Sequence, residues 1–232
     1  MTLLISAKCK DGIVLGSDSR SVMQDSSGAR VINDNEEKLI TLNEYCCVMV
    51  AGDSQAGVYL INKFKKNNNK TKDVVQLSQE LSEFCRKEYK PYINFGGSSN
   101  CPRVSFIIAG LEKENKKYTN PKIFVISSDT SFFTGEENYY AIVGKDDISN
   151  YLFTKLYNKY SISSEKMTEL IVQCLYDTEK IDGEAGGKMH LVSITEYGVG
   201  EIKIEPYIET IIQRDLVEIM DSNGESIPED KK

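Results

Sequence analysis

The strongest constraint on the fold is the order in which strand-like runs and helical patterns follow one another. Two pairs of short apolar runs come first, over residues 3–9 and 13–17 and over residues 38–42 and 46–51. Asp11-Gly12 separates the first two runs, and this dipeptide supplies the positive φ angles of a tight hairpin. We therefore expect the chain to begin with two β-hairpins.

Helical spacing replaces the strand pattern after Gly52, with apolar residues every three to four positions over 56–64 and 74–85. The later pattern predicts strands over 104–109, 123–127 and 139–143, helices over 148–156 and 167–174, and strands over 191–194 and 202–204. The charged stretch 112–117 is expected to be a solvated loop. Strands and helices are thus grouped and do not alternate, which favours antiparallel sheets covered by helices, four layers deep.

A chain of 232 residues with 40% hydrophobic side chains is long enough for one substantial core and short for two ordinary domains. We expect a single domain over residues 1–220. The polar residues 221–232 are expected to form a disordered tail.

Composition excludes several classes of function. A net charge of −7 provides no electrostatic footprint for nucleic acid. No run of eighteen apolar residues and no basic leader is present, so neither a membrane span nor a secretion signal is expected. His190 is the only histidine and the six cysteines contain no C-x-x-C pair, so we expect no metal and no cofactor. The cysteines are interpreted as buried thiols of a reducing compartment, which favours the cytoplasm.

Thr2 is the residue with the most informative chemistry. Removal of Met1 would leave a threonine that carries both a hydroxyl and a free α-amine. An α-amine titrates near about 7.7–8.0, so it can accept the hydroxyl proton at neutral pH and later return one to a leaving amine. The competing interpretation is that Met-Thr is simply a common way to start a protein.

Asp18 and Lys38 strengthen the catalytic interpretation. Asp18 follows the first predicted hairpin and Lys38 opens the second, so hairpins that are neighbours in one sheet would bring both charges to the start of the first strand. An ammonium group beside Thr2 would favour the alkoxide, and a carboxylate would hold that ammonium in place. The alternative is a surface salt bridge, worth about 0–1 kcal/mol.

The sequence resembles the proteasome β-type subunits, which are N-terminal-nucleophile hydrolases. The matching segments are Thr2-Leu3-Leu4, residues 10–20 (KDGIVLGSDSR), Lys38-Leu39-Ile40, Ala51-Gly52 and Asp182-Gly183-Glu184-Ala185-Gly186-Gly187. The resemblance spans nearly the whole chain. It implies an α+β fold, a four-layer αββα sandwich of two antiparallel sheets between helix layers, in agreement with the element order.

The resemblance also implies a role for each matching residue. Thr2 would be the nucleophile, Lys38 the cation that lowers its pKa, and Asp18 the partner of that lysine. The backbone N–H of Gly52 would stabilise the oxyanion, and Asp182 would position the α-amine and the hydroxyl. The substrate pocket would be lined by Ser21, Ile40, Val50 and Ser54, with the acidic Glu36 nearby.

Two family serines are replaced, by Ala185 and by Lys145 in Gly144-Lys145-Asp146. The expected function is a threonine-type hydrolase that cleaves peptide or amide bonds through an acyl-enzyme at Thr2. The alternatives are a noncatalytic structural or assembly subunit of the same fold, which the missing serines support, and an acyl-transfer variant. The expected partners are a peptide or protein substrate, further copies of the chain in a ring or related homo-oligomer, and a possible ATPase regulator.

Overall fold

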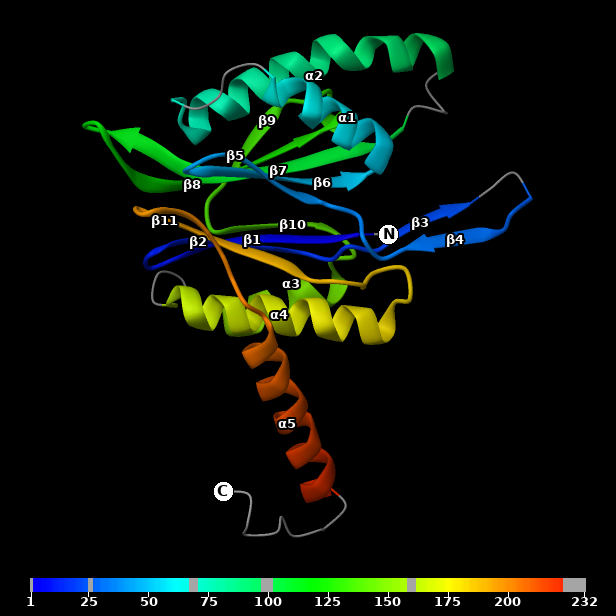
Figure 1. Cartoon of the computed structure of the whole chain (residues 1–232), viewed down its shortest axis with the longest axis vertical. Helices are drawn as coiled ribbons and strands as arrows, with labels where there is room; N and C mark the ends of the chain where they lie inside the picture. The colour runs from blue at the N-terminus through cyan, green and yellow to red at the C-terminus, as the bar shows by residue number, and fades with distance from the viewer. Residues whose placement is uncertain (1, 25–26, 67–70, 97–101, 158–161, 223–232) are drawn as a thin grey trace.

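Two five-stranded antiparallel sheets face each other in the middle of the molecule, with helices on both outer faces (Figure 1). The computed structural model describes residues 2–24, 27–66, 71–96, 102–157 and 162–222. The predicted α+β sandwich of helix, sheet, sheet and helix layers is confirmed.

The first sheet carries the start of the chain near its centre. Its strand order is β10 (Tyr140–Gly144), β1 (Leu3–Cys9), β2 (Gly12–Ser17), β11 (His190–Thr195) and β12 (Gly198–Glu201). Strand β1 pairs with β10 on one side and with β2 on the other, so Leu3 lies opposite Gly144 and Leu4 opposite Ser17. The beginning of β1 is therefore held between the ends of two strands.

The second sheet has the order β5 (Leu39–Asn43), β6 (Cys46–Gly52), β7 (Val104–Glu114), β8 (Lys117–Ser127) and β9 (Thr134–Glu137). The prediction of a loop over 112–117 was wrong. Strands β7 and β8 continue through this segment, and only Asn115 and Lys116 form the turn, with φ angles of 49° and 70°. Two consecutive positive φ angles are the geometry of a type I′ turn, which matches the twist of its strands.

Helices α1 (Ser54–Lys65) and α2 (Val74–Gly96) cover the second sheet, and α3 (Asp147–Leu156) and α4 (Ser164–Ile181) cover the first (Figure 1). Side-chain caps mark where two of these helices begin. The Asp53 carboxylate accepts the Ala56 N–H at the start of α1, and the Ser163 hydroxyl accepts the Lys166 N–H at the start of α4. All four helices were predicted from their spacing.

The core consists of three apolar layers because successive strand side chains point to opposite faces. In β1, Leu3 and Ile5 pack toward α3 and α4, while Leu4 packs between the sheets. Val48 of β6 packs toward α1 and α2. Both faces of β1 and β6 are thus buried, which fixes the register of these two central strands.

Three features of the fold were not predicted from the sequence or differ from its prediction. A two-stranded ribbon, β3 (Ser21–Gln24) and β4 (Arg30–Asn33), occupies the segment between Asp18 and Lys38 and projects from the side of the sandwich (Figure 1). Residues 202–204 are not a strand, since β12 ends at Glu201. The chain then forms α5 (Glu205–Ser222), so residues 221 and 222 are helical and not part of a disordered tail.

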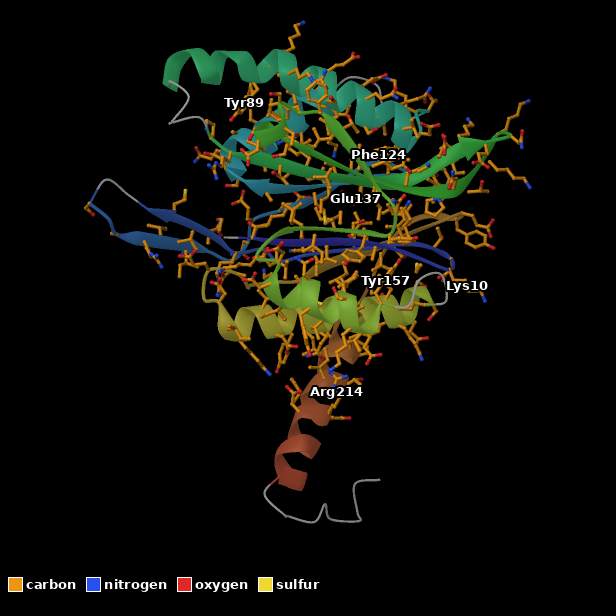
Figure 2. All side chains as sticks on the ribbon, turned by 180° about the vertical axis from the view of Figure 1, so that it is seen from behind. Lys10, Tyr89, Phe124, Glu137, Tyr157 and Arg214 are labelled. Atoms are coloured by element: carbon orange, nitrogen blue, oxygen red, sulfur yellow. The ribbon has the colours of Figure 1, made fainter. Side chains whose placement is uncertain are left out.

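Helix α5 extends away from the layers and is attached to α4 by polar contacts. Lys180 pairs with Asp215 at 2.8 Å, and Arg214 lies 3.7 Å from Glu169. Figure 2 shows Arg214 on α5, just below its junction with the helix layer. The expected disorder of residues 223–232 lies outside the described residues, and the domain boundary at residue 220 stays a prediction.

The predicted burial of the cysteines is confirmed for Cys46, Cys47, Cys85 and Cys174, which are free thiols, whereas Cys9 is half-buried. Burial raises the pKa of Cys9 to about 12, so its reactive thiolate is scarce at neutral pH. Cys101 lies outside the described residues. None of the helices within the described ranges has the length and apolar character needed to span a membrane.

Candidate active site

Thr2 lies immediately before β1 and is 9% exposed. Its carbonyl accepts the backbone N–H of Lys145 at 2.9 Å. On the other side, the N–H of Leu3 donates to the Asp18 carboxylate at 3.0 Å. The backbone of Thr2 is therefore held from two directions.

Gly144 makes the close approach to Thr2 possible. Its φ is +112°, and a β-carbon built on it would lie 1.7 Å from the Thr2 carbonyl oxygen. No L side chain fits at that distance, so the sequence needs glycine at the end of β10.

Asp18 follows β2 and is buried, with three donors on its carboxylate. Oδ1 accepts from the Leu3 N–H and from Lys38 Nζ at 2.8 Å, while Oδ2 accepts the Gly186 N–H at 3.1 Å. These bonds compensate the loss of water around the carboxylate. Asp18 thus links the start of β1, the start of the second sheet and the segment after α4.

Lys38 precedes β5, and its ammonium donates to Asp18 and to the Arg20 carbonyl. Burial lowers the pKa of Lys38, and the neighbouring Asp18 carboxylate opposes this shift. Asp18 and Lys38 do converge at the start of the first strand, but the expectation that their hairpins are neighbours in one sheet was wrong, because β1–β2 and β5–β6 belong to the two facing sheets.

Asp182 lies just beyond α4. Its Oδ1 accepts the Glu184 N–H at 2.9 Å, and its Oδ2 lies 3.2 Å from Lys145 Nζ. The Glu184 N–H, followed by the Lys145 ammonium, holds the pKa of Asp182 below its usual range. Lys145 thus combines a backbone bond to Thr2 with a side-chain bond to Asp182.

A cavity of about 690 Å³ opens beside Thr2. Its lining includes Thr2, Lys38 and Gly52 together with three of the predicted pocket residues, Ser21, Val50 and Ser54. Ile40 does not line this cavity. Strand alternation instead places Ile40 in the apolar layer under α1 and α2, and it borders a second cavity.

Gly52 forms the corner between β6 and α1. Its φ is +91°, and a β-carbon there would lie 2.1 Å from the Arg103 carbonyl oxygen. The next three residues, Asp53, Ser54 and Gln55, also line the cavity. The N-terminus of α1 therefore borders the cavity, and its partial positive charge suits a developing anion.

Sequence reasoning missed the far wall of the cavity and the network around Arg20. Arg103, which directly precedes β7, and Asp129 in η1 (Ser128–Thr130) line the cavity, more than 100 residues from Thr2 in the chain. The Arg20 guanidinium contacts Asp34 at 2.7 Å and donates to the carbonyls of Gly183 and Ala185. Arg20 is evident in the sequence two residues after Asp18, but its partners come from other segments that only the tertiary fold brings to it.

A second cavity, of about 1210 Å³, lies beside β5 and β12 and includes His190 in its wall. His190 is the first residue of β11. In the described part of the chain, no three His, Cys, Asp or Glu side chains are grouped as metal ligands.

Two antiparallel sheets between helix layers, with Thr2 at the start of a central strand, define an N-terminal-nucleophile-hydrolase-like fold. The family model described as "Proteasome subunit" matches residues 2–194. The chain therefore belongs to the proteasome subunit family.

Individual relatives agree with this assignment. The chain is 25% identical over 211 residues to proteasome subunit beta type-1 of Saccharomyces cerevisiae, covering 88% of each chain. It also resembles a solved structure described as the helical assembly of the Anbu complex from Pseudomonas aeruginosa. The TM-score of that match is 0.77 at 14% identity, with 99% of this chain and 100% of the other covered, so it supports the fold alone.

Proposed function

We propose that this protein is a threonine-type N-terminal-nucleophile hydrolase that cleaves peptide or amide bonds through an acyl-enzyme at Thr2. The observation that carries this proposal is the buried Lys38 ammonium in the wall of the cavity that Thr2 also lines. Proteasome family membership supports it. The proposal requires cleavage of the Met1–Thr2 bond, so that Thr2 gains a free α-amine.

Acylation follows from these groups. The α-amine takes the proton from Thr2 Oγ as that oxygen attacks the substrate carbonyl carbon, and Lys38 stabilises the negative charge on Oγ. The resulting oxyanion faces the backbone N–H of Gly52 and the N-terminus of α1. When the tetrahedral intermediate collapses, the α-ammonium protonates the departing amine, and Thr2 keeps the acyl group as an ester.

Deacylation repeats the same proton transfers with water. The α-amine accepts a proton from water, the hydroxide oxygen attacks the ester carbonyl, and Thr2 Oγ leaves with the proton. An amine in place of water would give the acyl-transfer variant from the same ester. Mass spectrometry of products made with and without an added amine separates these two outcomes.

Intact-mass analysis followed by reaction with a peptide epoxyketone tests the proposal. The expected result is loss of Met1 and one adduct on Thr2, absent in Thr2→Ala and retained in Thr2→Ser. Thr210→Ala, an exposed threonine on α5, is the matched control and should react normally. Retained Met1 or an unmodified Thr2 in protein from the native host would contradict the proposal and favour a noncatalytic subunit.

We further propose that the chain assembles with copies of itself. The solved structural relative is described as a helical assembly, and the β3–β4 ribbon carries three half-exposed apolar side chains, Met23, Val31 and Ile32. Light scattering should give a mass above that of one chain, lowered by Ile32→Lys but not by Tyr197→Lys at another exposed position. Three expectations from the sequence stay predictions: a peptide or protein substrate, a cytoplasmic location and an ATPase regulator.

A further inference from the structure

A closed ring of contacts surrounds the backbone of Thr2. The ring runs from the Thr2 carbonyl to the Lys145 N–H, and from Lys145 Nζ to the Asp182 carboxylate. The chain then continues to Gly186, whose N–H donates to Asp18, and Asp18 accepts the Leu3 N–H. One link in this ring is a side-chain ion pair, that of Lys145 with Asp182.

The segment that carries Lys145 joins the end of β10, where Gly144 pairs with Leu3, to the start of α3. Gly144 precedes it with φ +112°, a conformation that glycine adopts without steric cost and that leaves the backbone permissive. Asp146 follows as the N-cap of α3; its side chain caps no backbone N–H but accepts the Asn150 side-chain amide at 2.9 Å. The Lys145 N–H bond to Thr2 continues the β1–β10 pairing beyond Gly144, and the contact of the Lys145 side chain with Asp182 adds a tertiary restraint on its direction.

Asp182 is well placed to provide that contact. Its other carboxylate oxygen is bound by the Glu184 N–H, and its carbonyl accepts the Ala185 N–H, so the carboxylate itself is fixed relative to the turn. The same turn is held by Arg20 through the Gly183 and Ala185 carbonyls. The Lys145 ammonium thus meets a rigid partner.

We propose that Lys145 is a positioning residue, whose ammonium bonds to Asp182 and thereby holds the Gly144–Lys145 backbone against Thr2 in the geometry needed for acylation. This inference rests on the proposed function. It gives Lys145 a role in acylation, although Lys145 does not line the cavity.

The partial exposure of the Lys145–Asp182 pair indicates whether its loss should change the stability of the protein or the rate of acylation. The Lys145 and Asp182 side chains are 37% and 19% exposed, and an ion pair accessible to water contributes little to global stability. A displacement of a reacting group by about 1 Å, in contrast, can lower a rate by about a hundredfold. We therefore expect a change in the rate of acylation and an unchanged urea midpoint.

The test compares Lys145→Met and Lys145→Arg with the unchanged chain, all with Met1 removed. The readouts are the maximal inactivation rate and the half-saturating concentration of a peptide epoxyketone, together with urea unfolding. Lys145→Met should lower the maximal rate about tenfold and leave half-saturation within about twofold. Lys145→Arg, which can still pair with Asp182, should restore most of the rate. Lys180→Met, which removes the Lys180–Asp215 pair elsewhere on α4, is the matched control and should react normally.

Each result distinguishes this inference from the proposed function. An unchanged chain that forms no Thr2 adduct would contradict the proposed function. If the unchanged chain reacts and Lys145→Met has the same maximal rate, the positioning role is overturned. It is also overturned if Lys145→Met changes only the half-saturating concentration. Loss of rate in Lys145→Arg as severe as in Lys145→Met would also overturn it. A lowered urea midpoint in Lys145→Met would show a general structural role and overturn it.

Discussion

Lys38 Nζ lies 2.8 Å from Asp18 Oδ1, and each side chain of this pair is only 3% exposed. Transfer of two charges from water to such a site is unfavourable unless other hydrogen bonds accompany the pair. Here the Leu3 and Gly186 N–H groups and the Arg20 carbonyl provide those bonds. The pair therefore joins three chain segments around Thr2.

Loss of Lys38 should affect stability as well as chemistry. Lys38→Met leaves the buried Asp18 carboxylate without its cation, so we expect the free energy of unfolding to fall by about 3–5 kcal/mol. Urea unfolding measures this change. Lys166→Met, at an exposed position on α4, should change it by less than about 0.5 kcal/mol. Equal effects of the two substitutions would show that the pair is not a structural link.

The pKa of Lys38 predicts an alkaline limit to acylation. Burial lowers this pKa below 10.5, so the folded protein loses the ammonium at a lower pH than the unfolded chain does. Between the folded and unfolded pKa values the unfolded chain binds more protons, so this group's contribution to stability rises with pH there. The acylation rate, which needs the ammonium, should instead fall as pH rises through the folded pKa.

A rate profile against pH with the epoxyketone tests this limit. The midpoint of the alkaline decline should lie below pH 10.5. Asp18→Asn removes the carboxylate that opposes the shift, so its midpoint should move to lower pH. A decline centred at or above pH 10.5, or a midpoint that Asp18→Asn raises, would exclude Lys38 as the titrating group.

Local sequence signals account for much of the fold and for the chemistry beside Thr2. The hairpin joining β1 and β2 follows from Asp11-Gly12 between apolar runs, and the helices follow from their spacing. Asp18 and Lys38 could be placed because each lies at an end of a predicted hairpin. The prediction placed both hairpins in one sheet, and this was wrong: Asp18 and Lys38 meet across the two facing sheets.

Other parts of the fold and of the site have no local sequence pattern that predicts them. The end of the β7–β8 hairpin, residues 112–117, is largely exposed and charged, so its composition is typical of a loop. Its turn, Asn115-Lys116, lacks the glycine that usually marks a type I′ turn. Arg103 and Asp129 reach the cavity through strand pairing over long sequence separations. Ile40 was assigned to the pocket by resemblance, whereas strand alternation turns it toward the helices.

Gly144 offers a test of the backbone geometry at Thr2. Gly144→Ala would place a β-carbon 1.7 Å from the Thr2 carbonyl at a φ of +112°, so the backbone must move. We expect a loss of about 1–3 kcal/mol in the free energy of unfolding and a larger loss of Thr2 reactivity. Gly183→Ala, where nothing lies within 4 Å of the added carbon, is the control. Normal reactivity of Gly144→Ala would show that the register of Thr2 against Lys145 is unimportant.

The charges in the cavity predict a preference for basic substrates. Glu36 and Glu37 line the cavity, while the two cations among the described residues of its lining have acidic partners: Lys38 is paired with Asp18, and Arg103 lies 3.9 Å from Asp129. Glu36 Oε2 is held by two neutral donors, the Ser21 hydroxyl at 3.3 Å and the Asn33 amide at 3.4 Å. Its negative charge therefore remains available to a substrate cation.

Peptides that differ only in Arg or Leu before the cleaved bond measure this preference as a ratio of kcat/KM values. The Arg peptide should be preferred, and Glu36→Gln should lower the ratio about three- to fivefold, the range expected for an accessible ion pair. The Leu peptide should be cleaved by Glu36→Gln at nearly the unchanged rate, because that substitution keeps the shape of the side chain. Glu137→Gln on β9, an exposed position outside the cavity lining that is labelled in Figure 2, should leave the ratio as it is. A Glu36→Gln variant that loses the same factor on both peptides would show that Glu36 supports the cavity wall and does not bind the substrate cation.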